Sequence, residues 1–252
     1  MSEQSSGLRD SITAVESVSF RVAAGEVLGL VGQSGSGKTT IGRLVLKLER
    51  PSSGRILFEG QDISRLKGED LMNFRSKVQM IFQDPYESLN PRLSIRSSLE
   101  EPLLIHGMRD PHERLARVDD VLMKVGLTPE RFHGLRPHEL SGGQRQRVAI
   151  ARSLVLKPKL VVADEPVSML DVSVSAEILN LMLDFKKDMN VAYLFITHNL
   201  EHAAYFCDRI AVINKGRIVE QGSAESILRE PAHEYTRLLI AAIPSYARRT
   251  RQ

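Results

Sequence analysis

The stretch that decides the fold reads Gly32-Gln33-Ser34-Gly35-Ser36-Gly37-Lys38-Thr39-Thr40. It fits the phosphate-binding loop pattern G-x-x-x-x-G-K-[ST] at every position. An apolar run, Val27–Val31, precedes it and predicts a buried strand. Helix formers over residues 40–48 follow it and predict a helix that stops before Pro51. The order of strand, glycine loop and helix is the one that a phosphate site requires.

The residue types within this stretch suit a nucleoside triphosphate. Gly35 and Gly37 allow backbone N–H groups to turn inward, and the following helix N-terminus adds partial positive charge. We expect Lys38 to contact the outer phosphates and the Thr39 hydroxyl to bind Mg²⁺. The alternative is a Gly/Ser-rich surface turn, which the flanking strand and helix patterns disfavour. The whole stretch, residues 32–40, is therefore predicted to bind a nucleoside triphosphate with Mg²⁺.

Length and composition limit the remaining possibilities. The 252 residues suffice for one large domain or two small ones, and 42% hydrophobic residues can fill a core. The single cysteine, Cys207, excludes an intrachain disulfide framework and multi-cysteine metal sites. A formal net charge of +3 is too small to indicate nucleic acid. Because no apolar run approaches the ~20 residues of a membrane span, we expect a soluble cytoplasmic chain that can still bind a membrane partner.

The patterns along the chain predict an α/β domain with a helical insertion. Helix patterns predominate over residues 84–157, while strand patterns lie on either side. Strands are expected over residues 14–22, 55–60, 78–82, 160–163 and 191–196, with a hairpin over 210–219. The clearest helices are expected over 112–125, where Gly126 would be the C-terminal cap, from Asp171 onward, and over 233–243.

Three polar residues follow predicted strands and are candidates for the chemistry. Asp164 and Glu165 come directly after residues 160–163, and His198 follows the next predicted strand. Ligands of open α/β sheets gather at the carboxyl ends of parallel strands. Asp164 could then hold Mg²⁺, directly or through water, while Glu165 orients and deprotonates the attacking water. The alternative is a solvent-facing pair of carboxylates, and the phosphate loop argues against it.

A second helix start could also bind an anion. Residues 140–147 read Leu-Ser-Gly-Gly-Gln-Arg-Gln-Arg, in which Ser141 suits an N-cap and the glycines Gly142 and Gly143 permit close approach. We expect the helix to run through Arg152. Composition alone leaves an ordinary loop as an alternative.

Together these motifs resemble the nucleotide-binding subunit of an ABC transporter, over nearly the whole chain and in the family's order. The resemblance implies a P-loop NTPase fold with a mixed-sheet core, dimerisation, and ATP enclosed between two subunits. It implies that residues 32–40 are the Walker A loop and that Mg²⁺ is bound by Thr39, by Gln83, the Q-loop glutamine, and by Asp164, the Walker B aspartate. It further implies that Glu165 is the catalytic base, that His198 is the switch histidine, and that Asp171 belongs to the D-loop of residues 168–171. The signature, which acts in trans, would consist of Ser141, Gly142, Gly143 and Gln144.

Finer features are similar to the dipeptide, oligopeptide and nickel importers. They are residues 81–91, residues 170–174 and the ending that begins His233-Glu234-Tyr235-Thr236. On this basis we expect an ABC ATP-binding domain at 1–230, with its core at about 12–83 and 158–230, its helical subdomain at about 84–157, and a C-terminal extension at 231–252. The expected partners are a second ATPase subunit, identical or not, the transmembrane permease subunits and, indirectly, a substrate-binding protein. The expected location is the cytoplasmic face of the cell membrane, and no nucleic acid is expected.

Two departures from the family pattern matter. Relatives usually carry an aromatic residue that stacks on adenine, whereas Ser5 falls about where that residue would be and nothing before Phe20 is aromatic. Three explanations remain open: the chain starts late, it is half of a longer tandem protein, or it stacks the base only weakly. The cysteine cluster of some relatives is absent, so an iron–sulfur cluster is not implied.

Two other classes compete with the transporter. A non-transport ABC protein of translation or DNA repair commonly carries two such domains or a long coiled-coil insertion, and neither is seen here. A phosphate-loop kinase or GTPase would leave the Leu140–Gln144 stretch and His198 unexplained. The cargo, whether peptide, nickel or another solute, is not encoded in these motifs, because other subunits select it.

Overall fold

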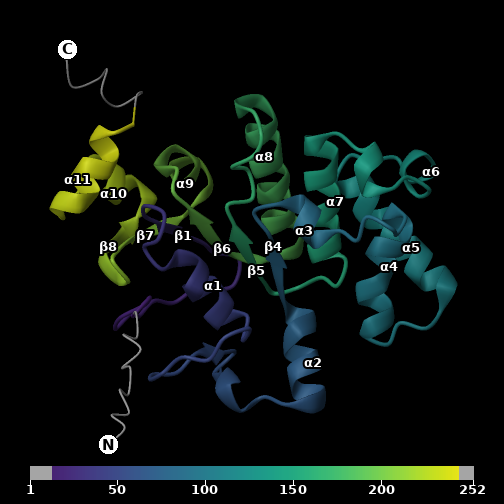
Figure 1. Ribbon diagram of the computed structural model, residues 1–252, viewed down its shortest axis with the longest axis horizontal. Coiled ribbons are helices and arrows are strands. Elements are labelled where there is room, and N and C mark those ends of the chain that lie inside the picture. Colours follow the sequence, from purple (N-terminus) through teal and green to yellow (C-terminus); the bar gives the residue numbers. More distant parts are fainter. Residues whose placement is uncertain (1–12, 244–252) are drawn as a thin grey trace, which may run out of the picture.

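A single twisted sheet organises the chain, whose computed structural model describes residues 13–243 (Figure 1). Its strands lie in the order β4-β5-β6-β1-β7-β8. The bounds are β1 Val27–Val31, β4 Val78–Ile81, β5 Leu160–Asp164, β6 Ala192–Thr197, β7 Arg209–Asn214 and β8 Arg217–Ser223. All pairings are parallel except that of β7 with β8. The predicted mixed sheet is therefore confirmed.

Helices cover the sheet and extend one end of the molecule. They are α1 Lys38–Val45, α2 Gly68–Lys77, α3 Pro85–Ser88, α4 Ile95–Ile105, α5 Pro111–Lys124, α6 Pro129–Phe132, α7 Gly142–Leu154, α8 Val172–Met189, α9 Leu200–Phe206, α10 Ala224–Arg229 and α11 Glu234–Ala241, with short 3-10 turns at Ile63–Arg65 and Pro137–Glu139. Figure 1 shows α3 to α7 gathered beyond β4 and α10 and α11 at the opposite end. The subdomain boundary at residues 84–157 stays a prediction.

The central strands β1, β5 and β6 are almost entirely apolar because both faces of the sheet are buried there. Their side chains alternate between two hydrophobic clusters, one on each face. In β1, Val27 and Val31 join the larger cluster with α7, α8 and α9, whereas Leu28 and Leu30 join a smaller one that includes Ile41 of α1. This double burial holds β1, and therefore the loop after it, at the centre of the sheet.

One strand prediction was wrong, and a second was confirmed only in part. Residues 14–22 form no strand, because Ser17 has φ 50°, a left-handed conformation that interrupts an extended run. The run at 55–60 contributes only β2, Leu57–Phe58, which pairs with β3, Gln61–Asp62, outside the main sheet. The turn between them uses positive φ at Glu59 and Gly60. The helix after the phosphate loop also differs, since it already begins at Lys38 and ends at Val45.

Other local predictions were confirmed. Gly126 takes a left-handed φ of 74° after α5, as a C-terminal cap requires. The turn Lys215-Gly216 joins β7 to β8, with φ 46° and 77°. Asp171 caps α8 through its side chain, which accepts from the Val174 N–H. Within residues 13–243, no helix is long and apolar enough to cross a membrane.

Candidate functional site

The predicted chemical residues meet at the carboxyl edge of the parallel strands. The register pairs Val31 with Thr197 and Asp164 with Ile196. The phosphate loop, which begins at Gly32, therefore leaves the sheet beside His198 and close to Glu165. This is the edge where ligands of open α/β sheets bind.

The loop at residues 32–40 is shaped by glycine. Gly37 has φ 101° and is the N-cap of α1, which has no side-chain cap. A Cβ on Gly37 would lie 2.4 Å from the Ala14 carbonyl oxygen, and one on Gly32 would lie 2.2 Å from that of Ile213. Both distances exclude any side chain. The first N–H groups of α1 are consequently left for a ligand to satisfy.

Lys38 lies folded against its own loop. Its Nζ donates to the carbonyl oxygens of Gly32 at 2.7 Å and Gln33 at 2.9 Å, and the residue is only 5% exposed. Burial lowers the pKa of Lys38, while the carboxylates of Glu165 and Asp164 act in the opposite direction. Lys38 thus places a positive charge between the loop and the two carboxylates.

Asp164 and Thr39 supply oxygen atoms suited to a divalent cation. Asp164 is 6% exposed at the end of β5. Burial raises its pKa, the hydrogen bond from the Thr39 side chain lowers it, and nearby Glu165 raises it further. A buried carboxylate beside a hydroxyl matches the ligands that Mg²⁺ prefers, and the cation would offset the cost of burying that charge.

Glu165 and His198 form a pair across neighbouring strands. Nδ1 of His198 lies 2.8 Å from Oε1 of Glu165, and since an ionised carboxylate only accepts, the Nδ1–H donates. Glu165 has a left-handed φ of 47°, a strain of about 1–3 kcal/mol that other contacts must offset. Its N–H is held by the Ile196 carbonyl oxygen at 2.9 Å. The pair lines a cavity of about 220 Å³ with Ser168.

Gln83 reaches the same edge from the outermost parallel strand. It is exposed and follows β4 by two residues, and Ile81 of that strand pairs with Ala163, which precedes Asp164. Its side chain thus starts near the carboxylates, but its role as a Mg²⁺ ligand stays a prediction.

The stretch at 141–144 lies elsewhere. Ser141 caps α7, its Oγ accepting from the Gln144 N–H at 3.3 Å while Gln144 Oε1 accepts from the Ser141 N–H at 3.0 Å. Its glycines face the start of α8, and a Cβ on Gly143 would lie 2.9 Å from Val174. Among the described residues no hydrogen bond joins Ser141 or Gln144 to the phosphate loop, and Figure 1 shows α7 well apart from α1. One chain therefore does not bring the two helix starts together.

Sequence reasoning missed a segment that supports the loop. The Gly216 N–H donates to the Ser36 carbonyl oxygen at 3.0 Å, and the Glu16 N–H donates to that of Gly216 at 2.8 Å. The turn signal at Gly216 was visible, but nothing local indicated its contact with residues 32–40. Ser5, where a base-stacking residue was expected, lies outside the described residues.

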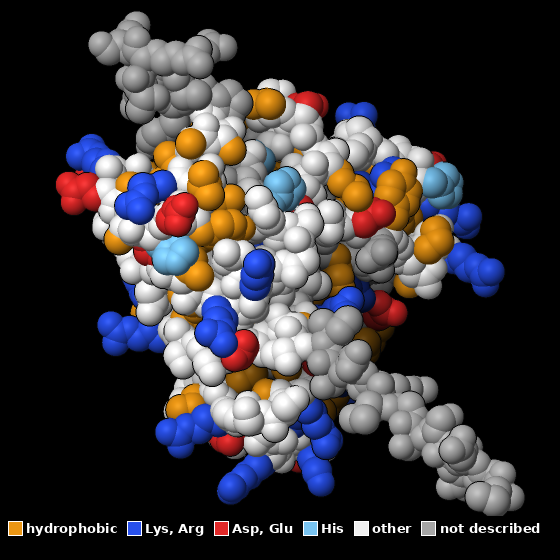
Figure 2. Space-filling view, turned by 60° about the vertical axis from the view of Figure 1, so that its left-hand side comes forward, with side chains coloured by type: hydrophobic (Ala, Val, Ile, Leu, Met, Phe, Trp, Pro, Cys, Tyr) orange, Lys and Arg blue, Asp and Glu red, His pale blue; other side chains and the backbone are white. Residues whose placement is uncertain are grey.

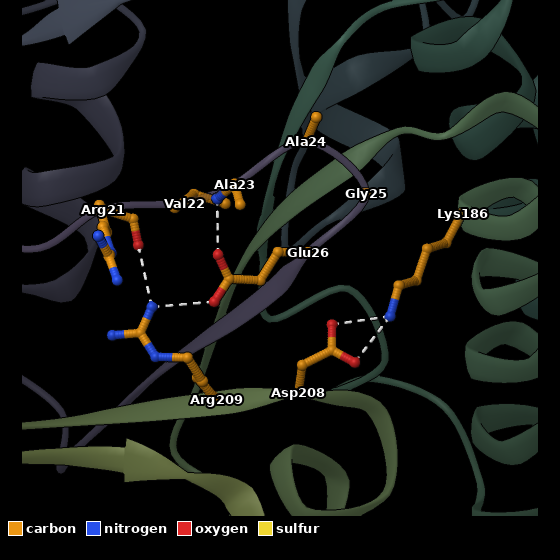
Figure 3. A pocket seen from close by; sticks show the side chains of 9 residues that line it. All are labelled: Arg21, Val22, Ala23, Ala24, Gly25, Glu26, Lys186, Asp208 and Arg209. Carbon is orange, nitrogen blue, oxygen red and sulfur yellow. Dashed lines mark hydrogen bonds and ion pairs between the residues drawn. The ribbon is translucent and has the colours of Figure 1, made fainter.

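An open depression at the other end of β1 is held together by ion pairs (Figure 3). Arg209 pairs with Glu26 at 2.9 Å, and Lys186 pairs with Asp208 at 2.7 Å. Asp208 also accepts from the Val27 N–H. These contacts fix the start of β1. Figure 2 shows Lys and Arg side chains spread over one face of the molecule, with Asp and Glu side chains among them.

Two family models match the chain. The ABC transporter model matches residues 15–168, more than half of the chain. The chain belongs to the ABC transporter family. A second model, the C-terminal region of oligopeptide/dipeptide transporters, matches residues 219–252 of this ABC ATPase. The family prediction, including its branch, is confirmed.

Individual relatives agree with this assignment. The oligopeptide transport ATP-binding protein OppF of Streptococcus mutans is 48% identical over 94% of this chain and 77% of its own length. CbiO1 of Clostridium perfringens, part of the ABC transporter complex cbiONQ, has a TM-score of 0.80 at 30% identity and covers 95% of this chain and 92% of its own. The cassette MJ0796, solved as a dimer with ADP and Pi, has a TM-score of 0.75 at 30% identity over 84% of this ABC ATPase and 90% of MJ0796. These findings give no support to a role in translation or DNA repair.

Proposed function

We propose that the chain is the ATP-hydrolysing subunit of an importer for peptides, working at the cytoplasmic face of the membrane. The observation that carries the proposal is the convergence of Lys38, Asp164, Glu165 and His198 at one sheet edge, in a chain whose end matches the oligopeptide/dipeptide transporter region. The name of the Streptococcus mutans relative supports peptides as the cargo class. The expected partners are permease subunits and, indirectly, a substrate-binding protein.

Each side chain has a defined task in this proposal. The N–H groups of the loop and the Lys38 ammonium bind the β- and γ-phosphates of ATP. Thr39, Asp164 and Gln83 would hold Mg²⁺, which when bound neutralises charge on the phosphates. The Lys38 ammonium has three N–H donors, and two of them bond the Gly32 and Gln33 carbonyl oxygens. The third is left for a phosphate oxygen, to which it would make a strong, charge-assisted hydrogen bond.

Glu165 is placed to act as the base. Its carboxylate would accept a proton from the water that attacks the γ-phosphate, while the His198 hydrogen bond fixes its orientation. The carboxylate is 13% exposed, so it stays largely shielded from competing water. The imidazole, at 53%, remains free to approach the phosphate.

A dimer completes the site. One chain has one phosphate loop and one Ser-Gly-Gly helix start, and these lie apart within it. Two copies, or this chain and a homologous subunit, would form two composite sites in which Ser141, Gly142, Gly143 and Gln144 of one chain face the ATP bound by the other, close to Asp171 of the D-loop. Closure on ATP and reopening after hydrolysis would move the permease through the Gln83 region.

The test is the Glu165→Gln variant, which keeps shape and hydrogen bonding but cannot accept a proton. We expect ATP binding to persist, hydrolysis to fall by about 10² or more, and an ATP-bound dimer to accumulate in size-exclusion chromatography. Glu177→Gln is the matched control, because Glu177 is an exposed residue of α8 paired with Arg147. Near-normal turnover by Glu165→Gln would reject the assignment.

A further inference from the structure

A hydrogen bond joins the C-terminal helix to the phosphate loop. The Gln33 N–H donates to the hydroxyl oxygen of Tyr235 at 3.2 Å, between residues 202 positions apart in the chain. Tyr235 lies in the first turn of α11 and is half-buried, its ring packed against the larger hydrophobic cluster. The hydroxyl therefore approaches the loop from a fixed position.

The bond acts on the same peptide group that holds Lys38. The Gln33 N–H belongs to the peptide unit whose carbonyl oxygen is that of Gly32, and this oxygen accepts from Lys38 Nζ at 2.7 Å. A peptide unit is planar, so fixing its N–H also fixes the direction of its carbonyl group. Tyr235 on one side and Lys38 on the other thus determine the orientation of a single peptide plane.

The helix that carries Tyr235 is itself firmly attached. The Glu220 carboxylate of β8 accepts from the N–H groups of Ala232 at 2.8 Å and His233 at 3.1 Å, just before α11 begins. Thr236 is fully buried and Ile240 is 9% exposed. The segment is thus joined to the sheet edge by hydrogen bonds and apolar packing together, so the position of the hydroxyl is set by the fold.

We propose that Tyr235 is a positioning residue for nucleotide binding, which orients the Gly32–Gln33 peptide and, through it, Lys38. The inference rests on the proposed function, because it takes residues 32–40 as the ATP site. Gln33 precedes the Gly35–Thr39 segment to which we assign the phosphate contacts, so its bond to Tyr235 can persist with nucleotide bound. A loop that is already ordered loses less conformational entropy on binding.

Tyr235→Phe tests the proposal by removing one oxygen atom and keeping the ring. A single hydrogen bond corresponds to roughly a two- to tenfold change in affinity, so we expect the Kd for ATP and ADP to rise by that factor in calorimetric titration. KM should rise likewise with kcat nearly unchanged, because bound phosphates then hold the loop. The matched control is Tyr205→Phe, because the Tyr205 hydroxyl donates to the Asn180 side chain of α8 and not to the phosphate loop.

A second comparison separates positioning from general support of the fold. In a Lys38→Ala background the Tyr235→Phe change should lose most of its effect on Kd, because the two side chains act on one peptide. Hydrogen exchange at residues 32–33 should be faster in Tyr235→Phe alone. An unchanged Kd, a rise no larger than that of Tyr205→Phe, or an equal loss with and without Lys38 would overturn the inference. Absence of ATP binding by the unmodified chain would instead refute the proposed function, and with it this inference.

Discussion

Two helices of this ATPase begin in opposite ways. At α1 the N-cap is Gly37, with φ 101° and no side-chain cap, whereas at α7 Ser141 and Gln144 cap each other. The first helix leaves its N–H groups open to a ligand, and the second satisfies its own. The open start is supported from distant segments through Gly216 and Tyr235, while the closed start is supported by residues three positions apart. In a single chain, therefore, the start of α1 has free N–H groups for a phosphate, whereas the N–H groups at the start of α7 are already capped by the chain itself.

The largest effect should come from removing the charge at the open start. Lys38→Ala should weaken ATP binding by at least about 10² and abolish turnover, because the outer phosphates lose their lysine. Direct titration and a phosphate-release assay measure this. Lys124→Ala, which removes a surface ion pair with Asp120, is the control. Wild-type affinity in Lys38→Ala would mean that nucleotide binds elsewhere.

Next in size is the backbone of the same loop. Gly37→Ala forces a side chain into a left-handed conformation and against the Ala14 carbonyl oxygen, so the loop must deform. We expect ATP affinity to fall by more than tenfold while the thermal midpoint changes by only a few degrees. Gly134→Ala is the control, because nothing lies within 4 Å of a Cβ there. Equal affinities for the two variants would show that the loop conformation does not matter.

The closed start should respond differently. Ser141→Ala removes a helix cap at a cost of about 0.5–2 kcal/mol, measurable by denaturant unfolding. ATP binding to a single chain should stay within about twofold of wild type, while ATP-dependent dimerisation and turnover fall. A loss of affinity in the monomer would contradict the assignment of Ser141 to the partner's nucleotide.

Mixing the two kinds of variant sharpens the comparison. Neither Lys38→Ala nor Ser141→Arg should hydrolyse ATP alone, but a mixed dimer contains one composite site with an intact loop and an intact Ser141. If the chain forms homodimers, part of the activity should return on mixing. Failure to recover activity, although mixed dimers form, would place both functions in the same chain.

The smallest effect concerns Glu220, whose hydrogen bonds attach the start of α11 and so support Tyr235. Burial acts to raise the pKa of Glu220, but hydrogen bonds, with those from Ala232 and His233 among them, lower it below its usual 4.5. The contribution of the Glu220 carboxylate to the free energy of unfolding is therefore fully present above about pH 4.5. It is lost as the pH falls through the pKa that Glu220 has in the folded protein. Glu220→Gln should lower the unfolding free energy by about 1 kcal/mol at pH 7 and by less near pH 3. A difference that does not depend on pH would rule out the carboxylate as the cause.

These regions also differ in what the sequence could predict. The Ser141 cap, the Asp171 cap and the Gly126 terminus were predictable, because each depends on residues a few positions apart. The convergence of Asp164 and His198 was predictable because buried parallel strands end at one edge. The contacts of Gly216 and Tyr235 with the loop were not, since no local pattern encodes which distant surface a helix will meet. The strand expected at 14–22 failed because Ser17 takes a left-handed conformation that alternation cannot reveal.

The central place of β1 has a consequence for how the protein is made. The two strands that pair with β1 are synthesised long after it: β6 spans residues 192–197 and β7 spans residues 209–214. Until those strands have been synthesised, both edges of the apolar segment Val-Leu-Gly-Leu-Val are unpaired. Unpaired apolar strands of this kind tend to associate with other chains. Because such long-range pairing is slow, the nascent chain passes through a stage open to aggregation. ATP binding requires β1 to be paired on both edges and therefore follows the synthesis of β7, so nucleotide can stabilise the folded subunit but cannot guide its early folding.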